Sequence, residues 1–544
     1  MIKIKDRNNL YIPGTEPWRN VLNDKKIKML NDSWAGVVRE HILPTFPVRE
    51  ISRHFSKNMG RPTKELVTTI GAIVLQQLFD FTDEESRDQM AFNEQWHYAL
   101  DSFSPDDQII SLKTLWNVRH LLISDQAANK LFQQATDKLA MVYNVDTRLQ
   151  RLDSVHIFSN MATLGRVRLL ARVVSIFLKN LKRHHSDEYK DTSLNDIKGR
   201  YEKEEDGAYF GNVKPSGSQK RIQDIALDMH FLIDFFSGNQ AVISMYSYKT
   251  MHRVFSEHCT VEHNAVLVKP AKEIPSDSIQ NPSDLDATYD GHKGQGYQVQ
   301  IMETYSRKDD DTDVGDKKLE LITHVKVEPA HIHDSKAIKP ALEDLDERDL
   351  LPEELSADTA YGSETNRALS KESGVDLISP VPGKKPEKDM TGFEYNETTC
   401  EIVKCPAGHI PLKIKRNRDS QTAVFSSEQC MSCSQRKTCP VKKGKRGYLL
   451  NYRDKDVKIT IHRQYEQSAE FKDKYRYRSG IEATNTRYIH MTGARRLRYR
   501  GLKRVDFAAT LKALGINIFR TAKFIRSCGI SAPDFQGIQL KLAV

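Results

Sequence analysis

The sequence lacks any apolar run that approaches the roughly 20 residues of a membrane-spanning helix, which argues against a membrane-embedded chain. Its first residues, MIKIKD, lack the apolar core of a secretory signal, so we expect a cytoplasmic protein. Cysteine is scarce: there are seven, an odd number, mostly in one short region, unlike a disulfide framework. No helix pattern directly follows Gly291, Gly294 and Gly296, so they predict a hairpin and not a phosphate-binding loop.

The composition that remains is typical of a globular protein. Hydrophobic residues make up 39% of the 544 positions and charged residues make up 28%, a balance found in folded and not in disordered chains. A chain of this length is enough for roughly two to four domains of about 100–200 residues each.

The basic charge is concentrated towards the C-terminal end. The formal net charge is +9, and residues 471–526 hold 15 Lys and Arg against 3 Asp and Glu, a local net of +12 that leaves −3 for the rest. Such clustering suits a polyanionic partner, because each cation that neutralises a phosphate releases condensed counterions. A solvated basic face would have the same composition, but interleaved tyrosines favour nucleic acid. These are Tyr475, Tyr477, Tyr488 and Tyr499.

Residues 1–145 have the pattern of a helical domain. Apolar residues recur at helical spacing over 65–79, after the breaker Gly60-Arg61-Pro62, and Thr82 begins another helix. A further helix is predicted over 111–122. Short helices joined by tight turns are compatible with a helix-turn-helix DNA reader and equally with a plain helical bundle.

Residues 146–384 carry strand patterns and predict the first part of an α/β core. Three strands, a helix, a strand, a helix and a last strand indicate a mixed sheet flanked by helices. The predicted strands are 149–157, 297–301, 321–327, 355–358 and 375–378. A helical insertion over about 165–285 separates the first two, and a Cys-containing insertion occupies 385–451. The helical residues 452–544 complete the core and carry the basic segment.

Two acids stand in apolar strand surroundings. Asp153 lies within the first strand, and Asp358 ends the fourth. A buried acid is costly unless it is paired or bound to a metal ion. Metal-dependent phosphodiester cleavage uses two Mg²⁺ ions about 3.5–4 Å apart, and a few converging carboxylates suffice to hold them. Either acid alone is a weak signal, because a strand-end Asp is more often a turn or cap residue.

A third acid belongs to a regular pattern. Tyr475, Arg478 and Glu482 are spaced i, i+3 and i+7, so on one continuous helix they point along about 0°, 300° and 340°. That stripe would place two phosphate-contacting groups beside a metal-binding acid. Three polar residues also share a face in many solvated helices, so the spacing alone leaves both interpretations open.

These residues together carry a resemblance to a known family. The Tyr-x2-Arg-x3-Glu pattern at Tyr475, Arg478 and Glu482 resembles the signature of bacterial insertion-sequence DDE transposases, in the branch named for its Tyr-Arg-Glu-Lys pattern. LDSVH at 152–156 and ADTAYGS at 357–363 resemble the two Asp motifs. RRLRYRGL at 495–502 resembles the basic stretch after the Glu, and Gly60-Arg61-Pro62 with the helices after it resembles the N-terminal helical domain.

The resemblance implies a ribonuclease H-like catalytic core in which Asp153, Asp358 and Glu482 bind two Mg²⁺ (or Mn²⁺) ions. It implies cleavage at the ends of an insertion sequence and attack of the 3′-OH on target DNA. The partners would be double-stranded DNA, as terminal inverted repeats and as target, and further copies of the chain in a homodimer or larger assembly. Residues 1–145 would bind DNA, and the protein would lie with the nucleoid of a bacterial cytoplasm.

The same resemblance assigns DNA contacts to the basic segment. Tyr475 and Arg478 would contact the element end. Further contacts would come from Arg487, Arg495, Arg496, Arg498 and Arg500. One position departs from the family: the expected Lys seven residues after the Glu is Ile489 here, so Arg487 or His490 would supply the cation.

Four cysteines form a second candidate metal site, within CPAGH at 405–409 and CMSCSQRKTC at 430–439. Cys-x2-Cys offers two thiolates from one turn, which suits tetrahedral Zn²⁺. The candidate ligands are Cys405, Cys430, Cys433 and Cys439. Cys405 stands alone unless Cys400 or His409 assists it, so reduced thiols in a small packed insertion are an equal alternative. Zinc there would stabilise the insertion and take no part in catalysis.

Another segment with metal-ligating residue types, His331-Ile332-His333-Asp334, favours a plainer interpretation. Asp334 or Ser335 is predicted to cap the following helix, with the two histidines on the surface.

Two other functions compete with transposition. One is a nuclease of the same superfamily that cuts without joining. The other is a transposase-derived DNA-binding protein, which the three intact acids disfavour because a pure binder does not need them.

Overall fold

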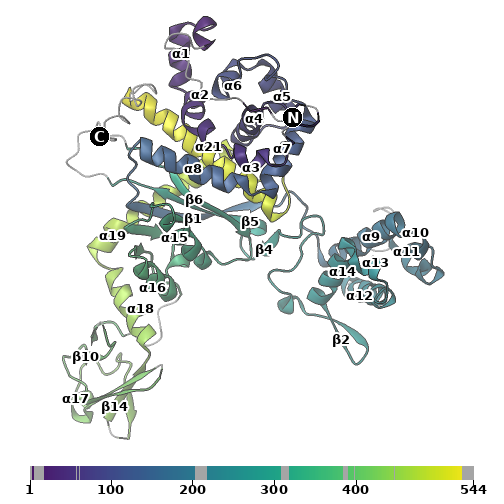
Figure 1. Cartoon of the computed structure of the whole chain (residues 1–544). Coiled ribbons are helices and arrows are strands. Elements are labelled where there is room, and N and C mark those ends of the chain that lie inside the picture. Colours follow the sequence, from purple (N-terminus) through teal and green to yellow (C-terminus); the bar gives the residue numbers. More distant parts are fainter. Residues whose placement is uncertain are drawn as a thin grey trace.

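A helical N-terminal part packs on a central sheet, and two smaller parts extend away from that sheet (Figure 1). The structure is a computed structural model that describes residues 3–4, 17–56, 58–60, 62–201, 217–307, 318–383, 390–396, 398–418, 420–445 and 447–529. Arg61 of the predicted breaker lies outside these residues. None of the helices within the described ranges combines the length and apolar character that a membrane span requires.

The N-terminal part is built around α4 (Leu66–Phe79). Thirteen of its 14 residues are buried, so it is a core helix, as its apolar run predicts. Glu65 caps it by accepting from two backbone N–H groups, and Thr82 and Glu85 form a capping box at the start of α5. The other helices are α1 (Asp24–Asn31), α2 (Trp34–Val37), α3 (Val48–Ser52), α5 (Asp83–Phe92), α6 (Glu94–Ala99), α7 (Leu112–Ser124) and α8 (Ala127–Val142), with the short turns η1 (Pro17–Asn20), η2 (Val38–Ile42) and η3 (Leu43–Thr45).

The central sheet has six strands in the order β4-β5-β1-β7-β8, with β6 also paired to β5. They are β1 (Leu149–Phe158), β4 (Thr288–Asp290), β5 (Gly294–Thr304), β6 (Ile322–Pro329), β7 (Glu354–Ala357) and β8 (Asp376–Ile378). β5 runs antiparallel to β1 and β6, whereas β7 and β8 continue parallel to β1. All five predicted core strands are confirmed, and the hairpin predicted at the three glycines is β4–β5. This mixed sheet, flanked by helices, is compatible with a ribonuclease H-like core.

Helices connect the later strands of the sheet. The 3-10 turn η7 (Asp334–Lys336) and α15 (Ile338–Asp346) link β6 to β7. A second turn, η8 (Thr359–Tyr361), and α16 (Glu364–Glu372) link β7 to β8, and Ser363 caps α16 as predicted.

The helical insertion between β1 and β4 forms a hydrophobic core of its own, separate from the main one. Its helices are α9 (Arg166–His184), α10 (Ser186–Tyr189), α11 (Asn195–Tyr201), α12 (Ser218–Phe235), α13 (Gln240–Ser244) and α14 (Tyr246–His258), with the turns η4 (Thr192–Leu194) and η6 (Ala271–Glu273). A hairpin of β2 (Cys259–Glu262) and β3 (Ala265–Val268) follows α14.

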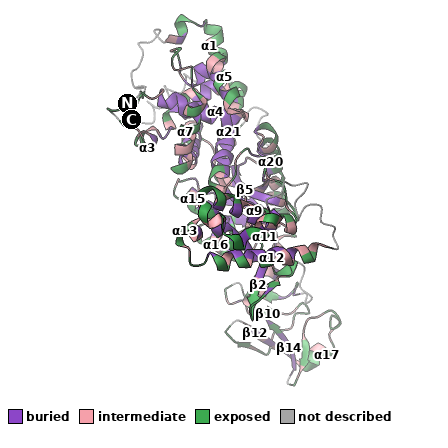
Figure 2. Ribbon diagram, turned by 90° about the vertical axis from the view of Figure 1, so that its right-hand side faces the viewer, coloured by how far each residue is buried: buried purple, intermediate pink, exposed green. Residues whose placement is uncertain are grey.

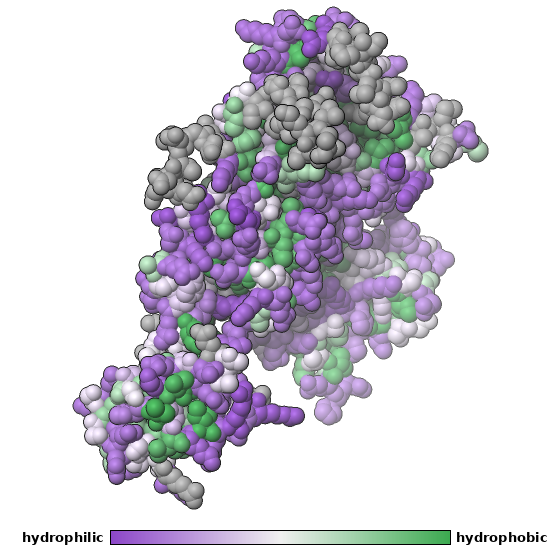
Figure 3. Space-filling model, turned by 60° about the vertical axis from the view of Figure 1, so that its left-hand side comes forward, coloured by the Kyte–Doolittle hydropathy of each residue, from purple (hydrophilic) through white to green (hydrophobic). Residues whose placement is uncertain are grey.

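The Cys-containing insertion is a small β-rich body with a third hydrophobic core. It consists of β9 (Glu394–Tyr395), β10 (Ile402–Lys404), β11 (Lys413–Arg416), β12 (Gln421–Phe425), α17 (Ser427–Met431), β13 (Lys442–Gly444) and β14 (Gly447–Tyr452). Hydrophobic side chains also show on its surface, at the lower left of Figure 3. The large exposed ones are Val403, Ile410, Leu412 and Met431.

The C-terminal helices return the chain from this insertion to the sheet. They are α18 (Asp454–Tyr465), α19 (Ala469–Tyr475), the 3-10 turn η9 (Arg476–Ser479), α20 (Gly480–Met491) and α21 (Leu502–Cys528). α21 contacts α4, α8 and β6, so it joins the N-terminal part to the sheet, and both α4 and α21 are largely buried (Figure 2).

The prediction of one continuous helix through Tyr475, Arg478 and Glu482 is wrong. α19 ends at Tyr475, and η9 separates it from α20. The carbonyl of Tyr477 accepts from Gly480 N, three residues on, and from Arg151 Nη1 at 2.9 Å. A contact from β1 therefore stabilises the tighter turn.

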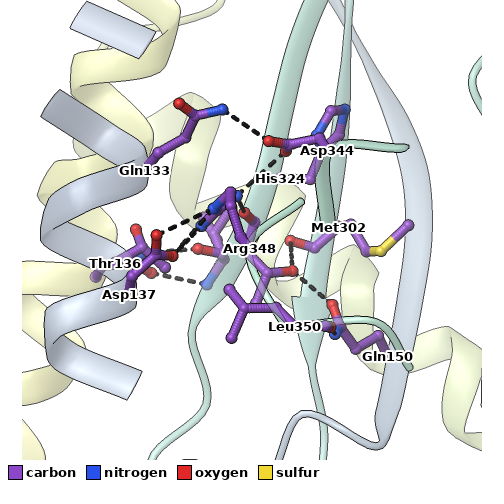
Figure 4. Close-up of polar contacts among 12 residues, drawn as sticks. Gln133, Thr136, Asp137, Gln150, Met302, His324, Asp344, Arg348 and Leu350 are labelled. Carbon is purple, nitrogen blue, oxygen red and sulfur yellow. Dashed lines mark hydrogen bonds and ion pairs between the residues drawn. The ribbon is translucent and has the colours of Figure 1, made fainter. Parts of the chain in front are cut away.

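A polar network fastens α8 to the sheet and to α15 (Figure 4). Arg348, just after α15, pairs with Asp137 of α8 and with Asp344 of α15. Its Nη1 also donates to the carbonyl of Thr323 in β6 at 2.9 Å. Asp344 in turn accepts from Gln133 of α8 at 2.7 Å. Because the Arg348 side chain is only 8% exposed, removing it leaves its acidic partners without their counter-charge.

We predict that Arg348→Met lowers the free energy of unfolding of the sheet and N-terminal part by about 3 kcal/mol, the typical effect of breaking a buried ion pair. Urea denaturation followed by circular dichroism measures it. Lys339→Met is the matched control. The Lys339–Glu343 pair on α15 is mostly exposed, so its loss should leave the free energy of unfolding nearly unchanged. Equal midpoints for Arg348→Met and the wild type would contradict the prediction.

Candidate active site

Asp153 and Asp358 lie side by side on adjacent parallel strands. Leu152 of β1 pairs in register with Ala357, the last residue of β7. The residue after Leu152 is Asp153, and the residue after Ala357 is Asp358. The register of the two strands therefore brings the two predicted acids together. Asp358 leaves the strand at this point, and its Oδ1 accepts from Thr359 N at 2.6 Å.

The surroundings of Asp153 disfavour its ionised form. Burial, together with the negative charges of Asp358 and Asp334, raises the pKa of this carboxyl to about 6. The backbone N–H of Ser154 and the guanidinium of Arg478 act in the opposite direction. Two neighbouring carboxylates in a partly buried site therefore need a cation nearby.

Asp334, which the sequence predicted only as a candidate helix cap, is a third carboxylate of this cluster. Gln300 of β5 donates to its Oδ1 at 3.0 Å, and Gln300 in turn accepts from the Tyr361 hydroxyl at 2.7 Å. Burial raises the pKa of Tyr361 well above its ordinary value, and the charges of Asp334, Asp153 and Asp358 add to the effect. The three aspartates thus surround one buried tyrosine.

The expected capping role of Asp334 or Ser335 is not what the structure shows. At η7 the cap is the His333 side chain, which accepts from Ser335 N at 3.1 Å. His333 is exposed as predicted, and His331 contacts Thr288 through its ring. The carboxylate of Asp334 is left to face Gln300.

Glu482 is connected to the aspartates through Arg478. The Arg478 guanidinium bonds to Glu482 Oε1 at 2.9 Å, while its charge also acts on Asp153. Tyr475 stacks on Phe471, and its pKa is raised by burial and by the charges of Asp358 and Asp153. Tyr475 and Arg478 therefore stand beside the aspartate pair. The Glu482 side chain is 64% exposed, so it faces solvent at the rim of the site.

A buried ionic cluster holds α20 against the sheet. Glu303 of β5 is fully buried and pairs with Arg151 at 2.7 Å and with Arg520 of α21 at 2.8 Å. Thr484 of α20 donates to the same carboxylate at 2.6 Å. A Cβ at Gly480 would meet the Arg151 guanidinium at 2.1 Å, so a side chain at the first residue of α20 would displace that guanidinium from its present contacts. These contacts fix the helix that carries Glu482.

The carboxylates of Asp153, Asp358 and Glu482 are suitable ligands for Mg²⁺, but their side chains do not converge on one point. Carboxylate oxygens are the hard ligands that Mg²⁺ prefers. Among the described residues no group of three or more His, Cys, Asp or Glu side chains is arranged to hold a metal ion.

The basic loop between α20 and α21 points its arginines outward. Ala494 and Leu497 are buried and Tyr499 is partly buried, whereas the predicted DNA-contacting arginines of this loop are exposed. Arg495 and Arg496 lie over the ring of Phe158 at the end of β1, at 5.1 and 5.9 Å. The exposed residues are Arg495, Arg496, Arg498 and Arg500.

This loop is anchored to the N-terminal part by Lys512. The ammonium group, 1% exposed within α21, pairs with Asp80 at the end of α4 at 2.9 Å and donates to the carbonyl of Thr492. Arg498 pairs with the same aspartate at 3.6 Å. The arginines are thus carried by a loop that is held at both sides.

Another cation, which sequence reasoning missed, borders the acids from the β4–β5 turn. Lys293 Nζ lies 3.2 Å from Ser154 Oγ and 3.9 Å from Asp334 Oδ2. Burial lowers the pKa of His156 to about 4, and Lys293 and Arg495 contribute to that shift. A row of positive groups therefore follows β1 away from Asp153.

Arg487, one of the two residues expected to replace the missing lysine, lies on a different face of α20 from Glu482. Ile489 packs partly buried against the main core. Arg487 is exposed and lines a cavity of about 390 Å³ together with Arg520 and Lys523. At 100° per residue Arg487 lies about 140° around the helix from Glu482.

The four predicted zinc ligands are gathered in the Cys-containing insertion. Burial raises the pKa of the Cys430 thiol, and the charges of Cys439, Cys405 and Cys433 raise it further. All seven cysteines of the chain are free of disulfides. The thiols lie close to one another, although they do not form a ligand set for a metal ion in this arrangement.

Two family models match the chain. One, described as a transposase DDE domain, matches residues 404–522 and so includes Tyr475, Arg478, Glu482 and the basic loop. The other, described as a transposase domain, matches residues 29–121 in the N-terminal helices. No curated protein and no solved structure matches the chain significantly. The strands with Asp153 and Asp358 lie outside both matches, so their case rests on sheet register and electrostatics.

We predict that Asp153→Asn stabilises the metal-free protein at pH 8. The pKa of Asp153 is raised from 3.8 to about 6 on folding, so its ionised form destabilises the fold above pH 6 by up to about 3 kcal/mol. This destabilisation disappears as the pH falls below about 4. The unfolding midpoint in Mg²⁺-free buffer at pH 8 and pH 4 checks it, with the exposed Glu372→Gln as control. A lower midpoint for Asp153→Asn at pH 8 would refute it.

Proposed function

The chain belongs to the DDE transposases of insertion sequences, and on that basis we propose that it cleaves the ends of its element and joins the 3′-OH ends to target DNA. The substrates are double-stranded DNA, first the terminal inverted repeats and then the target. The reaction is phosphoryl transfer that depends on Mg²⁺ or Mn²⁺.

The observation that carries the proposal is the pairing of Asp153 with Asp358. The register of β1 and β7 makes them neighbours, and Tyr475 and Arg478 lie beside them. A pair of adjacent carboxylates, in which burial disfavours the ionisation of Asp153, is expected of a cation-binding centre. Such a centre, next to groups that contact phosphate, fits DNA cleavage better than DNA binding alone.

In this proposal the acids share one task. Asp153, Asp358 and Glu482 would hold two divalent ions, which supply the activated nucleophile and stabilise the leaving oxygen. Arg478 gives up Glu482 when a DNA phosphate takes its place as the partner of the guanidinium. Tyr475 lines the site next to the aspartates and orients the DNA end.

The fold agrees with a ribonuclease H-like catalytic core. The five core strands have the order β6-β5-β1-β7-β8, with β5 alone antiparallel to the others. We infer that residues 146–384 and 452–544 form this core around the helical insertion of about 165–285, and that the Cys-containing insertion at 385–451 is a separate unit. The helices of residues 1–145 are proposed to bind DNA.

The basic residues are proposed as the path of the element end. Lys293, Arg495 and Arg496 follow β1 away from Asp153, and Arg498 and Arg500 continue the exposed series. Each exposed cation that meets a phosphate contributes through counterion release, so binding should weaken steeply with salt. Pairing of two element ends is the reason to expect a homodimer or larger assembly.

A structural zinc ion is proposed for the Cys-containing insertion. The thiols of Cys405, Cys430, Cys433 and Cys439 act on one another electrostatically, and a divalent cation would relieve that repulsion. Its role would be to stabilise the small core of this insertion.

We predict that Asp153→Ala, Asp358→Ala and Glu482→Ala each reduce Mg²⁺-dependent cleavage by on the order of a hundredfold or more, because each removes a carboxylate from metal-assisted transfer. The assay uses duplexes with the inverted repeats that flank the coding region and scores nicking and strand-transfer products separately. Glu372→Ala, exposed on α16, is the control and keeps full activity.

Full cleavage by any of the three variants would remove that residue from the mechanism. Cleavage without strand-transfer products by the wild type would identify a nuclease instead. DNA binding without nicking in the presence of Mg²⁺ would identify a binding protein.

We predict that protein purified without chelators contains about one zinc per chain, and that Cys430→Ser with Cys433→Ser removes it by eliminating two ligands. Elemental analysis measures the metal content. Cys528→Ser, an exposed cysteine at the end of α21, is the control and retains zinc. Wild-type protein without zinc would end the idea.

A further inference from the structure

Asn485 is the residue of α20 that touches Asp153. Its Nδ2 donates to Asp153 Oδ2 at 3.0 Å. This bond joins the helix of Glu482 to the strand of Asp153, although 332 positions separate the two residues in the sequence. Nothing in the sequence pattern indicated Asn485, because the signature around Glu482 is defined by Tyr475 and Arg478.

The other end of the same amide has no partner. Asn485 Oδ1 is buried and makes no hydrogen bond among the described residues. A buried acceptor without a partner carries its full desolvation penalty, so each such atom calls for an explanation. Turning the amide over does not remove the problem, since it would set Oδ1 against the carboxylate of Asp153.

Asn485 shares α20 with Glu482 and is hydrogen-bonded to Asp153 of β1. Asn485 is three residues after Glu482 within α20, so the two side chains lie about 60° apart on one face of the helix. Asp153 borders Asn485 on the other side. An amide carbonyl is a hard oxygen donor, a type found among the ligands of Mg²⁺ and Ca²⁺.

We propose that Asn485 is a ligand of the divalent ion shared by Asp153 and Glu482, with Oδ1 facing the ion. This inference rests on the proposed function, because it presumes that the acids bind divalent ions. It adds a neutral oxygen to a site otherwise made of carboxylates. It also explains why an acceptor is kept buried and unpaired next to Asp153.

A role limited to holding Asp153 would use only the Nδ2 donor, and two substitutions separate the two roles. Asn485→Ala removes both donor and ligand. Asn485→Asp replaces the amide by a carboxylate, which can bind the ion but would repel Asp153 in its absence. A ligand role therefore predicts that the Asp variant binds the ion more tightly than the Ala variant, and a purely positioning role predicts the reverse order.

The experiment titrates Mn²⁺ into the full-length protein bound to a pre-cleaved duplex that ends at the element's 3′ terminus, and follows the electron paramagnetic resonance signal of the free ion. We expect Asn485→Ala to weaken Mn²⁺ binding about tenfold, the lower end of the loss seen when support of a metal site is removed. Asn485→Asp should bind at least as tightly as the wild type. Asn417→Ala, an exposed asparagine of the Cys-containing insertion, is the matched control.

The outcomes are distinguishable. Wild-type binding by Asn485→Ala, or weaker binding by Asn485→Asp than by Asn485→Ala, would overturn the ligand role while the proposed function stands. Asp153→Asn combined with Asp358→Asn gives the background of ions bound elsewhere. Wild-type binding no greater than that background would overturn the proposed metal site, and the ligand role with it. Circular dichroism melts confirm that the variants compared are folded.

Discussion

Two carboxylates forced together by sheet register are the constraint on which this site depends. Asp153 and Asp358 are neighbours because Leu152 pairs with Ala357, and no side-chain rearrangement can separate adjacent parallel strands. Burial disfavours the charged form of Asp153, so a positive group beside it stabilises the site. In the protein alone Arg478 supplies that charge and binds Glu482 at the same time.

Buried ion pairs hold the elements around this site in place. The Arg151–Glu303–Arg520 cluster fixes the start of α20, and Lys512 fixes the loop of arginines that follows it. α21 and the network around Arg348 fasten the N-terminal helices to the same sheet. The helical and Cys-containing insertions each have a hydrophobic core of their own. The residues of these cores pack against one another and not against the sheet.

The sequence was sufficient for features that depend on local pattern. Alternation and apolar runs predict the five core strands, and apolar spacing predicts α4, because residues that are buried on one face of an element recur with the period of that element. The pairing of Asp153 with Asp358 also follows once the strands are assigned to a parallel pair. The break at η9 could not be foreseen, since it depends on a hydrogen bond between Arg151 and Tyr477, 326 positions apart.

The same limit applies to Asp334 and Asn485. Each is a polar residue in a segment where helix caps and solvated faces are common. Its place in the site is apparent only from a hydrogen bond to a residue on another element. For Asp334 a signal did exist, because it follows β6, a strand that runs parallel to β1 and ends on the same side of the sheet. Asn485 carries no such signal beyond its place one turn after Glu482.

The most direct test of the central claim is a structure of the protein with Mn²⁺ and a pre-cleaved element end, in which anomalous scattering locates the ions. The account predicts ions bound by Asp153 and Asp358, with Glu482 released from Arg478 and turned towards them. Ions absent from the aspartate pair, or Glu482 still bonded to Arg478 while the site is filled, would contradict it.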